Sequence, residues 1–230
     1  MLNRIAIAVL VLSAAACAVR HPRLVTPQLR AQASLQSLPA PGEYPIDSSG
    51  SELRLLVYRA GPLGNLGHNH VMVNRAVTGR VQIGAGVSES SFSLSMRAEG
   101  FVVDDAQSRQ EEGGDFSGDI PEDAKAGTRR NMLSGAVLNA AEFPDITVRS
   151  ASLTGTLNEL NVDLEISAAG HTSRISVPLS LQGDAHHFIA AGSMELRQTA
   201  LGLIPYSLMH GALQVQDAML LKFQITVLTN

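Results

Sequence analysis

The chain of 230 residues carries a formal net charge of -4, and only 17% of its residues are charged. This balance excludes the concentrated basic face that binding to a phosphate backbone requires, so nucleic acid is not an expected partner. Hydrophobic residues make up 45% of the chain and aromatic residues 4%, with no tryptophan. The interior is therefore expected to be lined by aliphatic side chains and methionine. The single cysteine excludes an intrachain disulfide framework.

Residues 1–17 have the layout of a secretory signal peptide. A charged start is followed by an apolar run from Ile5 to Leu12, too short to stay in a bilayer as a spanning helix, and then by small residues. The end of the segment, Ala14-Ala15-Ala16-Cys17, is similar to a bacterial lipobox, with alanine where leucine is usual. We expect an exported, periplasmic lipoprotein that a lipid on Cys17 anchors to the membrane. The alternative is cleavage after an Ala-x-Ala site, which leaves Cys17 unmodified.

Residues 18–42 contain three arginines and four prolines, without a sustained apolar period. Such a composition is typical of a flexible connection. We therefore predict a tether over residues 18–42 and a folded domain over residues 43–230.

Apolar and polar side chains alternate through the folded domain, which is typical of half-buried β-strands. The clearest alternations run over Val77–Ile83, Phe92–Ala98, Val162–Ile166, Ile175–Leu181 and Leu221–Val227. Glycine-rich or polar breaks separate the strands at hairpin spacing. About eight strands with one interruption predict an all-β antiparallel fold, either a closed barrel or a sandwich.

The interruption runs from Asp104 to Pro144. Its first half is acidic and contains one basic residue, Arg109, so we expect a solvated rim. Its second half reads as helical, with a capped start at Asp119-Ile120-Pro121-Glu122 and a second start at Thr128. One helical face carries Met132, Leu133, Ala136 and Val137. An insertion of this length is usually functional, and we expect its helix to cover the mouth of a barrel.

His68 and His70 form a His-x-His pair directly after Gly67. On a strand both imidazoles share a face, and they would hold a metal ion if a third ligand such as His171 or His210 lay close. The other interpretation, which we favour, is that they stand at a barrel end and meet backbone groups or a ligand's polar head. Nucleophile elbows and phosphate-binding glycine loops are missing from the sequence. We therefore predict a protein that is not an enzyme, with no cofactor and no metal.

An eight-stranded barrel has room for side chains or for one small elongated ligand, and aliphatic walls favour an aliphatic ligand. The alternative is a barrel filled by its own side chains. The residues that we expect to contact a ligand lie on the strands, on the insertion helix and at the histidine pair. They are His68, His70, Phe92, Leu94, Met96, Met132, Leu133, Val137, Ile175, Val177 and Phe223.

Several segments together resemble the YceI-like family of exported lipid-binding barrels. They are Tyr44–Asp47, Leu66–Val71, Arg129–Leu133, Phe143–Ile146 and Gln198–Pro205, in that order along the chain. The resemblance covers about residues 42 to 230. It implies an extended lipocalin-like antiparallel barrel that in some members holds a polyisoprenoid chain, and a binding role without catalytic residues. The acidic insertion is longer than in the compact members of the family.

The leading hypothesis is therefore a periplasmic, membrane-anchored protein that holds an isoprenoid or a similar aliphatic lipid inside a β-barrel. Two alternatives stay open. One is a metal-binding envelope protein that uses His68 and His70. The other is an envelope protein with a structural or interaction role, in which the acidic insertion is the docking surface.

Overall fold

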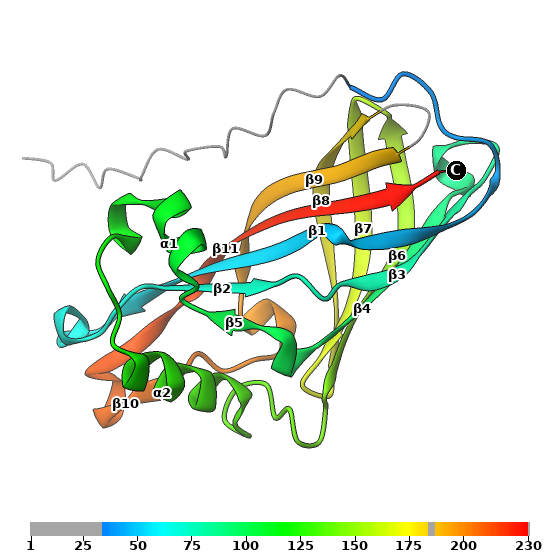
Figure 1. Ribbon diagram of the computed structural model, residues 1–230. Coiled ribbons are helices and arrows are strands. Elements are labelled where there is room, and N and C mark those ends of the chain that lie inside the picture. The colour runs from blue at the N-terminus through cyan, green and yellow to red at the C-terminus, as the bar shows by residue number, and fades with distance from the viewer. Residues whose placement is uncertain (1–33, 184–186, 230) are drawn as a thin grey trace, which may run out of the picture. The chain divides into compact units, whose positions relative to one another are not determined.

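Antiparallel strands close into a barrel in the computed structural model, which describes residues 34–183 and 187–229 (Figure 1). The wall runs through β1, β3, β4, β6, β7, β8, β9 and β11, and β11 then pairs with β1. The bounds of these strands are β1 Gly42–Ala60, β3 Thr78–Ile83, β4 Ser91–Arg97, β6 Asp145–Thr156, β7 Glu159–Ala168, β8 His171–Gly183, β9 His187–Arg197 and β11 Leu213–Leu228. The predicted all-β fold is confirmed, and of the two architectures it is the closed barrel.

Shorter elements complete the fold. The short strands are β2 His70–Asn74, β5 Val102–Val103 and β10 Ser207–Leu208, and the two α-helices are α1 Ala106–Glu112 and α2 Glu122–Leu133. Single turns of 3-10 helix are η1 Gly64–Leu66, η2 Val87–Glu89, η3 Ala98–Gly100, η4 Gly114–Phe116, η5 Thr199–Leu201 and η6 Met209–Gly211. Within the described part of the chain, no helix has the length and apolar character needed to cross a membrane.

The strand β1 closes the barrel through a long antiparallel ladder with β11. Apolar residues face each other across this ladder, and the inward-facing partners include Leu53 with Phe223 and Leu55 with Leu221. Every wall strand has a partner on both sides, but β8 pairs with β9 only over Ser180–Gly183, and among the described residues its stretch 171–179 pairs with β7 alone.

On its other side, β1 pairs with two strands in succession. Its C-terminal half pairs with β2 and its first residues pair with β3, so β2 and β3 act as one strand with a break at residues 75–77. Asn74 stabilises the break, since its side chain accepts from the Ala76 N–H at 2.9 Å and donates to the Arg97 carbonyl at 3.0 Å. β5 pairs with β2 and continues into the insertion.

The first half of the insertion packs on the outer face of the barrel. The expectation of a solvated acidic rim holds for the exposed Asp115 and Asp119 but was wrong for Asp104, which is buried. Leu56, Val71 and Val73 point outward from β1 and β2, and each is at most 2% exposed. They form a second small core with Phe116 of η4, which is 4% exposed and packs edge-on against Tyr58 at 5.5 Å between ring centroids. The apolar outer face of these strands explains why the segment lies against them.

The acidic residues of α1 are paired with cations of the wall. Glu111 and Glu112 accept hydrogen bonds from Arg54 of β1 at 2.8 and 2.9 Å, and Lys222 of β11 donates to Glu112 at 2.5 Å. The helix begins after Asp105, whose carboxylate accepts from the Ser108 N–H at 3.1 Å. These charges are therefore part of the contact between the insertion and the barrel.

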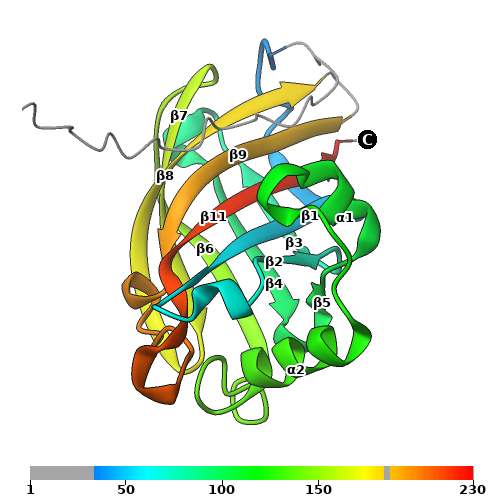
Figure 2. The same ribbon diagram turned by 90° about the vertical axis from the view of Figure 1, so that its left-hand side faces the viewer.

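The second helix, α2, lies across one end of the barrel, whereas α1 lies at its side (Figure 2). Arg129 fixes the helix to η3, because its guanidinium donates to the carbonyl of Phe101 and, at 2.7 Å, to the carbonyl of Glu99. Two sequence expectations were wrong in detail. Pro121 is the residue before the first turn and no side chain caps it, and the helix runs through Thr128 without a new start. Val137 lies beyond the end of the helix.

The signal peptide, Cys17 and residues 18–33 of the predicted tether lie outside the described residues. The remainder of the predicted tether contacts the barrel. Leu35 is buried in the main core and its N–H donates to the Leu181 carbonyl at 3.1 Å, while Ser34 forms a bridge with Gln182. The folded unit therefore begins at or before Ser34 instead of at residue 43.

We predict that Phe116→Ala lowers the free energy of unfolding by about 3 to 5 kcal/mol, because it empties the centre of the outer core. Urea unfolding followed by far-ultraviolet circular dichroism measures the change. Ile204→Ala is the control, since Ile204 is 76% exposed and its truncation is expected to change stability by less than about 0.5 kcal/mol. Equal effects of the two substitutions would show that the insertion is not packed on the wall.

Candidate functional site

The barrel encloses a cavity of about 570 Å³. All eight wall strands contribute side chains to it, together with α2 and the loops at one end. This volume lies within the range of roughly 300 to 1,000 Å³ that is usual for small-molecule sites. Along β1 the lining extends from Ile46 to Arg59, which corresponds to a length of up to about 40 Å at about 3.3 Å per residue.

Most of the residues that line the cavity are leucine, valine, isoleucine, methionine or phenylalanine. Leu94, Val148 and Leu164 stand in the middle of their strands and point inward, yet they are only half-buried. Side chains in a filled core would be fully buried there, so these residues face open space. The barrel is hollow, and the alternative of a filled interior is wrong.

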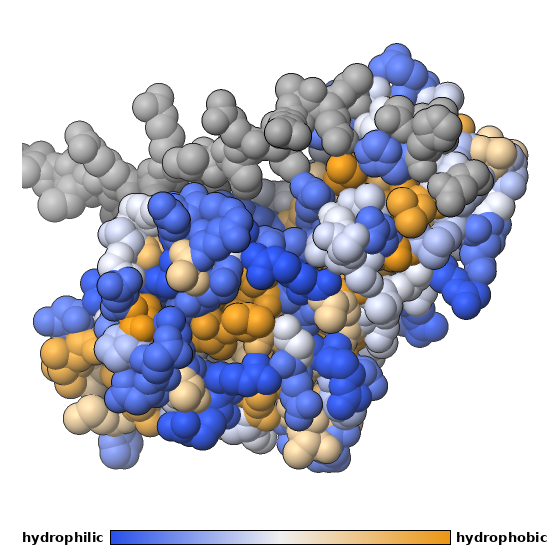
Figure 3. All heavy atoms as spheres, in the orientation of Figure 1, coloured by the Kyte–Doolittle hydropathy of each residue, from blue (hydrophilic) through white to orange (hydrophobic). Residues whose placement is uncertain are grey.

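The two ends of the cavity differ. We call the end formed by loops 61–69 and 198–212 and by α2 the mouth, and the opposite end the base. At the mouth, Leu66 and Leu208 line the cavity while remaining 68% and 43% exposed. Hydrophobic residues gather at the left of the face shown in Figure 3, where η1 and β10 lie. At the base, Ile83, Leu181 and Phe188 are buried and close the interior.

The structure places all but two of the predicted ligand-contacting residues on the cavity wall. Those on the wall are His68, His70, Phe92, Leu94, Met96, Met132, Val137, Val177 and Phe223. Leu133 and Ile175 do not line the cavity. Both are half-buried and pack against the core, Leu133 at the last turn of α2 and Ile175 on the stretch of β8 nearer to η5.

His70 is held at the mouth by a buried carboxylate. Its Nδ1 lies 2.6 Å from Asp104 Oδ2, and the Asp104 side chain is fully buried. The other carboxylate oxygen accepts from the Val71 N–H at 2.9 Å and from Arg109 Nη1 at 2.7 Å. Arg109 also donates to the Asn69 carbonyl at 2.9 Å, so this network connects α1 to β2. Asp104 adopts a left-handed conformation with φ of 56°, which aspartate tolerates better than most residues.

Burial raises the pKa of Asp104, but the opposing effects of His70, the Val71 N–H and Arg109 are larger in sum. The pKa of Asp104 therefore lies below its ordinary value of 3.8. At neutral pH the group is an ionised carboxylate paired with the Arg109 guanidinium. Removing one partner from such a pair leaves the other charge buried and unpaired.

The other ring nitrogen of His70, Nε2, faces α2, which we call the lid helix because it lies across the mouth. Thr128 Oγ1 of α2 lies 3.3 Å from His70 Nε2, and both residues line the cavity. The ring of His68 stands edge-on to His70 with 6.2 Å between centroids and is largely exposed. The two imidazoles therefore stand together at the mouth, one fixed by Asp104 and one at the surface.

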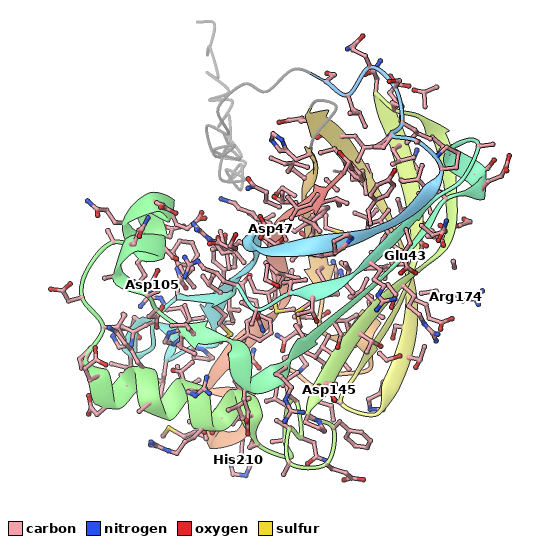
Figure 4. The ribbon with its side chains drawn as sticks, turned by 45° about the vertical axis from the view of Figure 1, so that its right-hand side comes forward. Glu43, Asp47, Asp105, Asp145, Arg174 and His210 are labelled. Atoms are coloured by element: carbon pink, nitrogen blue, oxygen red, sulfur yellow. The ribbon has the colours of Figure 1, made fainter. Side chains whose placement is uncertain are left out.

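A third metal ligand is not brought to this pair. Over residues 34–183 and 187–229, no group of three histidine, cysteine, aspartate or glutamate side chains is close enough to hold an ion. His171 and His210 are both exposed and neither lines the cavity, and His210 points away from the barrel (Figure 4). The alternative of a metal site at His68 and His70 therefore has no support in the described residues.

Sequence reasoning did not identify the residues that position His70. Asp104 and Arg109 belong to the acidic run that the sequence predicts to be solvated, although Asp104 is 1% exposed and Arg109 is 6% exposed. The available signal was that the run contains one basic residue, five positions after an aspartate that directly follows a strand. Leu66 and Leu208 were also missed, because single apolar residues in loops carry no periodic pattern.

Comparisons with known proteins agree with this description. The family model of the YceI-like domain matches residues 44–227. The crystal structure of Burkholderia cenocepacia BcnA is similar with a TM-score of 0.58 at 12% sequence identity, over 79% of this chain and 98% of that chain. A crystal structure of the Campylobacter jejuni YceI protein gives a TM-score of 0.43 at 7% identity, over 57% and 70% of the two chains. None of the curated proteins matches the chain.

Asp104→Asn is predicted to lower the free energy of unfolding at pH 7 by about 3 to 5 kcal/mol, because it leaves Arg109 buried without its counter-charge. The pKa of Asp104 is lowered on folding, so its contribution is present above the unfolded-state value and is lost as the pH falls below about 4. The stability of the variant should therefore depend less on pH between about 4 and 2. Urea unfolding at a series of pH values measures both effects.

Asp119→Asn is the control for this experiment, because Asp119 is exposed. Its substitution is expected to change stability by less than about 0.5 kcal/mol. If Asp104→Asn were as stable as the unmodified chain at pH 7, the proposed ionic network would be wrong.

Proposed function

Since this chain belongs to the YceI-like family, we propose that it is a periplasmic binding protein that holds an isoprenoid or a similar aliphatic lipid inside its barrel. The observation that carries the proposal is the hollow, apolar interior of about 570 Å³. The family is one of binding proteins, which supports a role in binding over one in catalysis.

The shape and chemistry of the cavity favour a long flexible chain. Each buried methylene contributes about 0.8 kcal/mol, so a chain that follows the barrel axis would bind tightly without a charged anchor. Planar ligands are usually stacked against aromatic side chains. Only Phe92, Phe101, Phe188, Phe223 and Tyr206 supply aromatic rings to the lining, and aliphatic residues provide the rest of its apolar surface.

The lid helix explains how a bound chain would be separated from water. Met132 and Leu138, on and just after α2, line the cavity and are less than 10% exposed. Arg129 attaches this helix to η3 by two hydrogen bonds to backbone carbonyls. Movement of α2 relative to the loops of the mouth would admit a chain, and return of the helix would bury it.

The interaction role gains less support. That alternative requires the acidic insertion to present free charge to a partner. In the structure Glu111 and Glu112 of α1 are paired with Arg54 and Lys222, and Asp104 is fully buried. The main anionic groups of α1 therefore stabilise the insertion on the wall, which leaves Asp115, Asp119 and Asp123 as exposed carboxylates.

Membrane anchoring through Cys17 is the second part of the proposal. It is supported by the apolar run, the small residues and the single cysteine at the end of residues 1–17. An exported protein with a lipid at this position would meet apolar cargo at the membrane from which the cargo comes.

Native mass spectrometry of the protein purified from its own host tests the binding function. We expect a bound apolar molecule that organic solvent extracts from the protein. Protein that is consistently free of such a molecule, and that takes up none from lipid extracts, would contradict the proposal.

A substitution inside the barrel makes the test specific. Leu94 lines the cavity at mid-barrel and Ser93, its neighbour on β4, is exposed on the outer face. Leu94→Trp should weaken binding of the extracted lipid at least tenfold by occupying the path of the chain. The matched Ser93→Trp should leave affinity unchanged, and equal effects of both would place the ligand outside the barrel.

Metabolic labelling with a palmitate analogue tests the anchor. The unmodified chain should carry label and sediment with membranes, whereas Cys17→Ala should carry none and be released as a soluble protein. Labelling that persists in Cys17→Ala would show that Cys17 is not the lipidated residue.

A further inference from the structure

Most polar side chains that line the cavity lie at the mouth, and Ser90 and Ser91 are the polar lining residues outside it. The polar residues of the mouth are Arg59, His68, His70, Thr128, Asn131, Gln198, Tyr206 and Gln214. Most of the interior offers a ligand no hydrogen-bonding partner. A chain lying along the barrel would therefore place one end against this group, and the chemistry of that end is what the group can distinguish.

The position of Asp104 determines what His70 offers to the cavity. The ionised carboxylate only accepts hydrogen bonds, so His70 Nδ1, 2.6 Å away, carries the hydrogen between them. In the neutral imidazole the second nitrogen, Nε2, is then an acceptor. The carboxylate cannot turn away, because the Val71 N–H and Arg109 hold its other oxygen. In its neutral form, His70 therefore presents a fixed Nε2 lone pair at the mouth.

This acceptor is poorly satisfied within the protein. Its available partner is the Thr128 hydroxyl at 3.3 Å, which is longer than a well-formed hydrogen bond from a hydroxyl group. The His70 side chain is only 13% exposed. A hydrocarbon end placed against it would remove the remaining water and leave Nε2 without a good partner, which is unfavourable.

We propose that His70 forms a subsite that selects lipids ending in an uncharged hydroxyl group, which donates to Nε2 and displaces Thr128. This inference rests on the proposed function, because it concerns one end of the same bound chain. The fixed charges directly behind His70, Asp104 and Arg109, are paired with each other at 2.7 Å and supply no net positive charge. Arg59 also lines the cavity at the mouth, so the local charge alone does not select the head. The lone pair of Nε2 does, because it needs a donor and an ionised acidic head carries no hydrogen to donate.

The test compares two probes of equal length, geranylgeraniol and its methyl ether. The ether keeps the oxygen but has no hydrogen to donate. Competitive displacement of a fluorescent apolar dye from the purified chain gives both dissociation constants. We expect the alcohol to bind about tenfold more tightly than the ether, the effect of one hydrogen bond to a desolvated acceptor.

Two variants assign the preference to His70. His70→Phe should bind both probes with the affinity that the unmodified chain has for the ether, so the preference disappears. Thr128→Val removes the competing internal donor and should increase the preference for the alcohol. Because Thr128→Val keeps the size of the side chain, it tests the inference even if His70→Phe does not fold. His171→Phe is the matched control, since His171 is exposed and does not line the cavity.

The outcomes separate the two proposals. Equal affinity of the unmodified chain for the two probes, or a preference that survives in a folded His70→Phe variant, would overturn the polar subsite and leave the lipid-binding function intact. Failure of both probes, together with failure of every extracted lipid, would overturn the lipid-binding function and the subsite with it.

Discussion

The two edges and the two faces of β1 determine where the rest of the structure lies. Along one edge this strand pairs with β11 and closes the barrel, and along the other edge it pairs with β2 and β3. Its inward side chains, including Leu53 and Leu55, line the cavity. Its outward side chains, Leu56 and Arg54, bind the insertion through an apolar contact and an ionic contact. One strand therefore positions both the hollow interior and the segment that leads to the lid.

The sequence pattern predicted the fold well because period-two alternation reports which side of a strand is buried. The same pattern does not distinguish a filled barrel from a hollow one, since Leu94 and Val148 are apolar in either case. The insertion was misjudged for a different reason. Glu111 and Glu112 appear as solvated charges in a local reading, and their partners Arg54 and Lys222 are distant in sequence. Contacts between residues that are far apart in the sequence form only on folding, so they leave no pattern in a short stretch of sequence.

The interior and the mouth have different physical characters. Apolar burial is non-directional and accepts many chains of similar size, whereas a hydrogen bond requires a particular group at a particular point. The buried network of Asp104 and Arg109 adds a directional hydrogen-bonding group to the apolar cavity, because it fixes one ring nitrogen of His70 at the edge of that cavity. The insertion that appeared to be a peripheral acidic loop thereby becomes part of the binding site.

The bridge between Ser34 and Gln182 gives the barrel a direction. It fastens the N-terminal part of the domain to the base, and β1 then runs from the base to the mouth over up to about 60 Å at about 3.3 Å per residue. An attachment of the chain ahead of Ser34 would therefore hold the barrel at its base. In the anchored form that we propose, the N-terminal attachment would lie at the end of the barrel opposite the mouth through which a chain would enter.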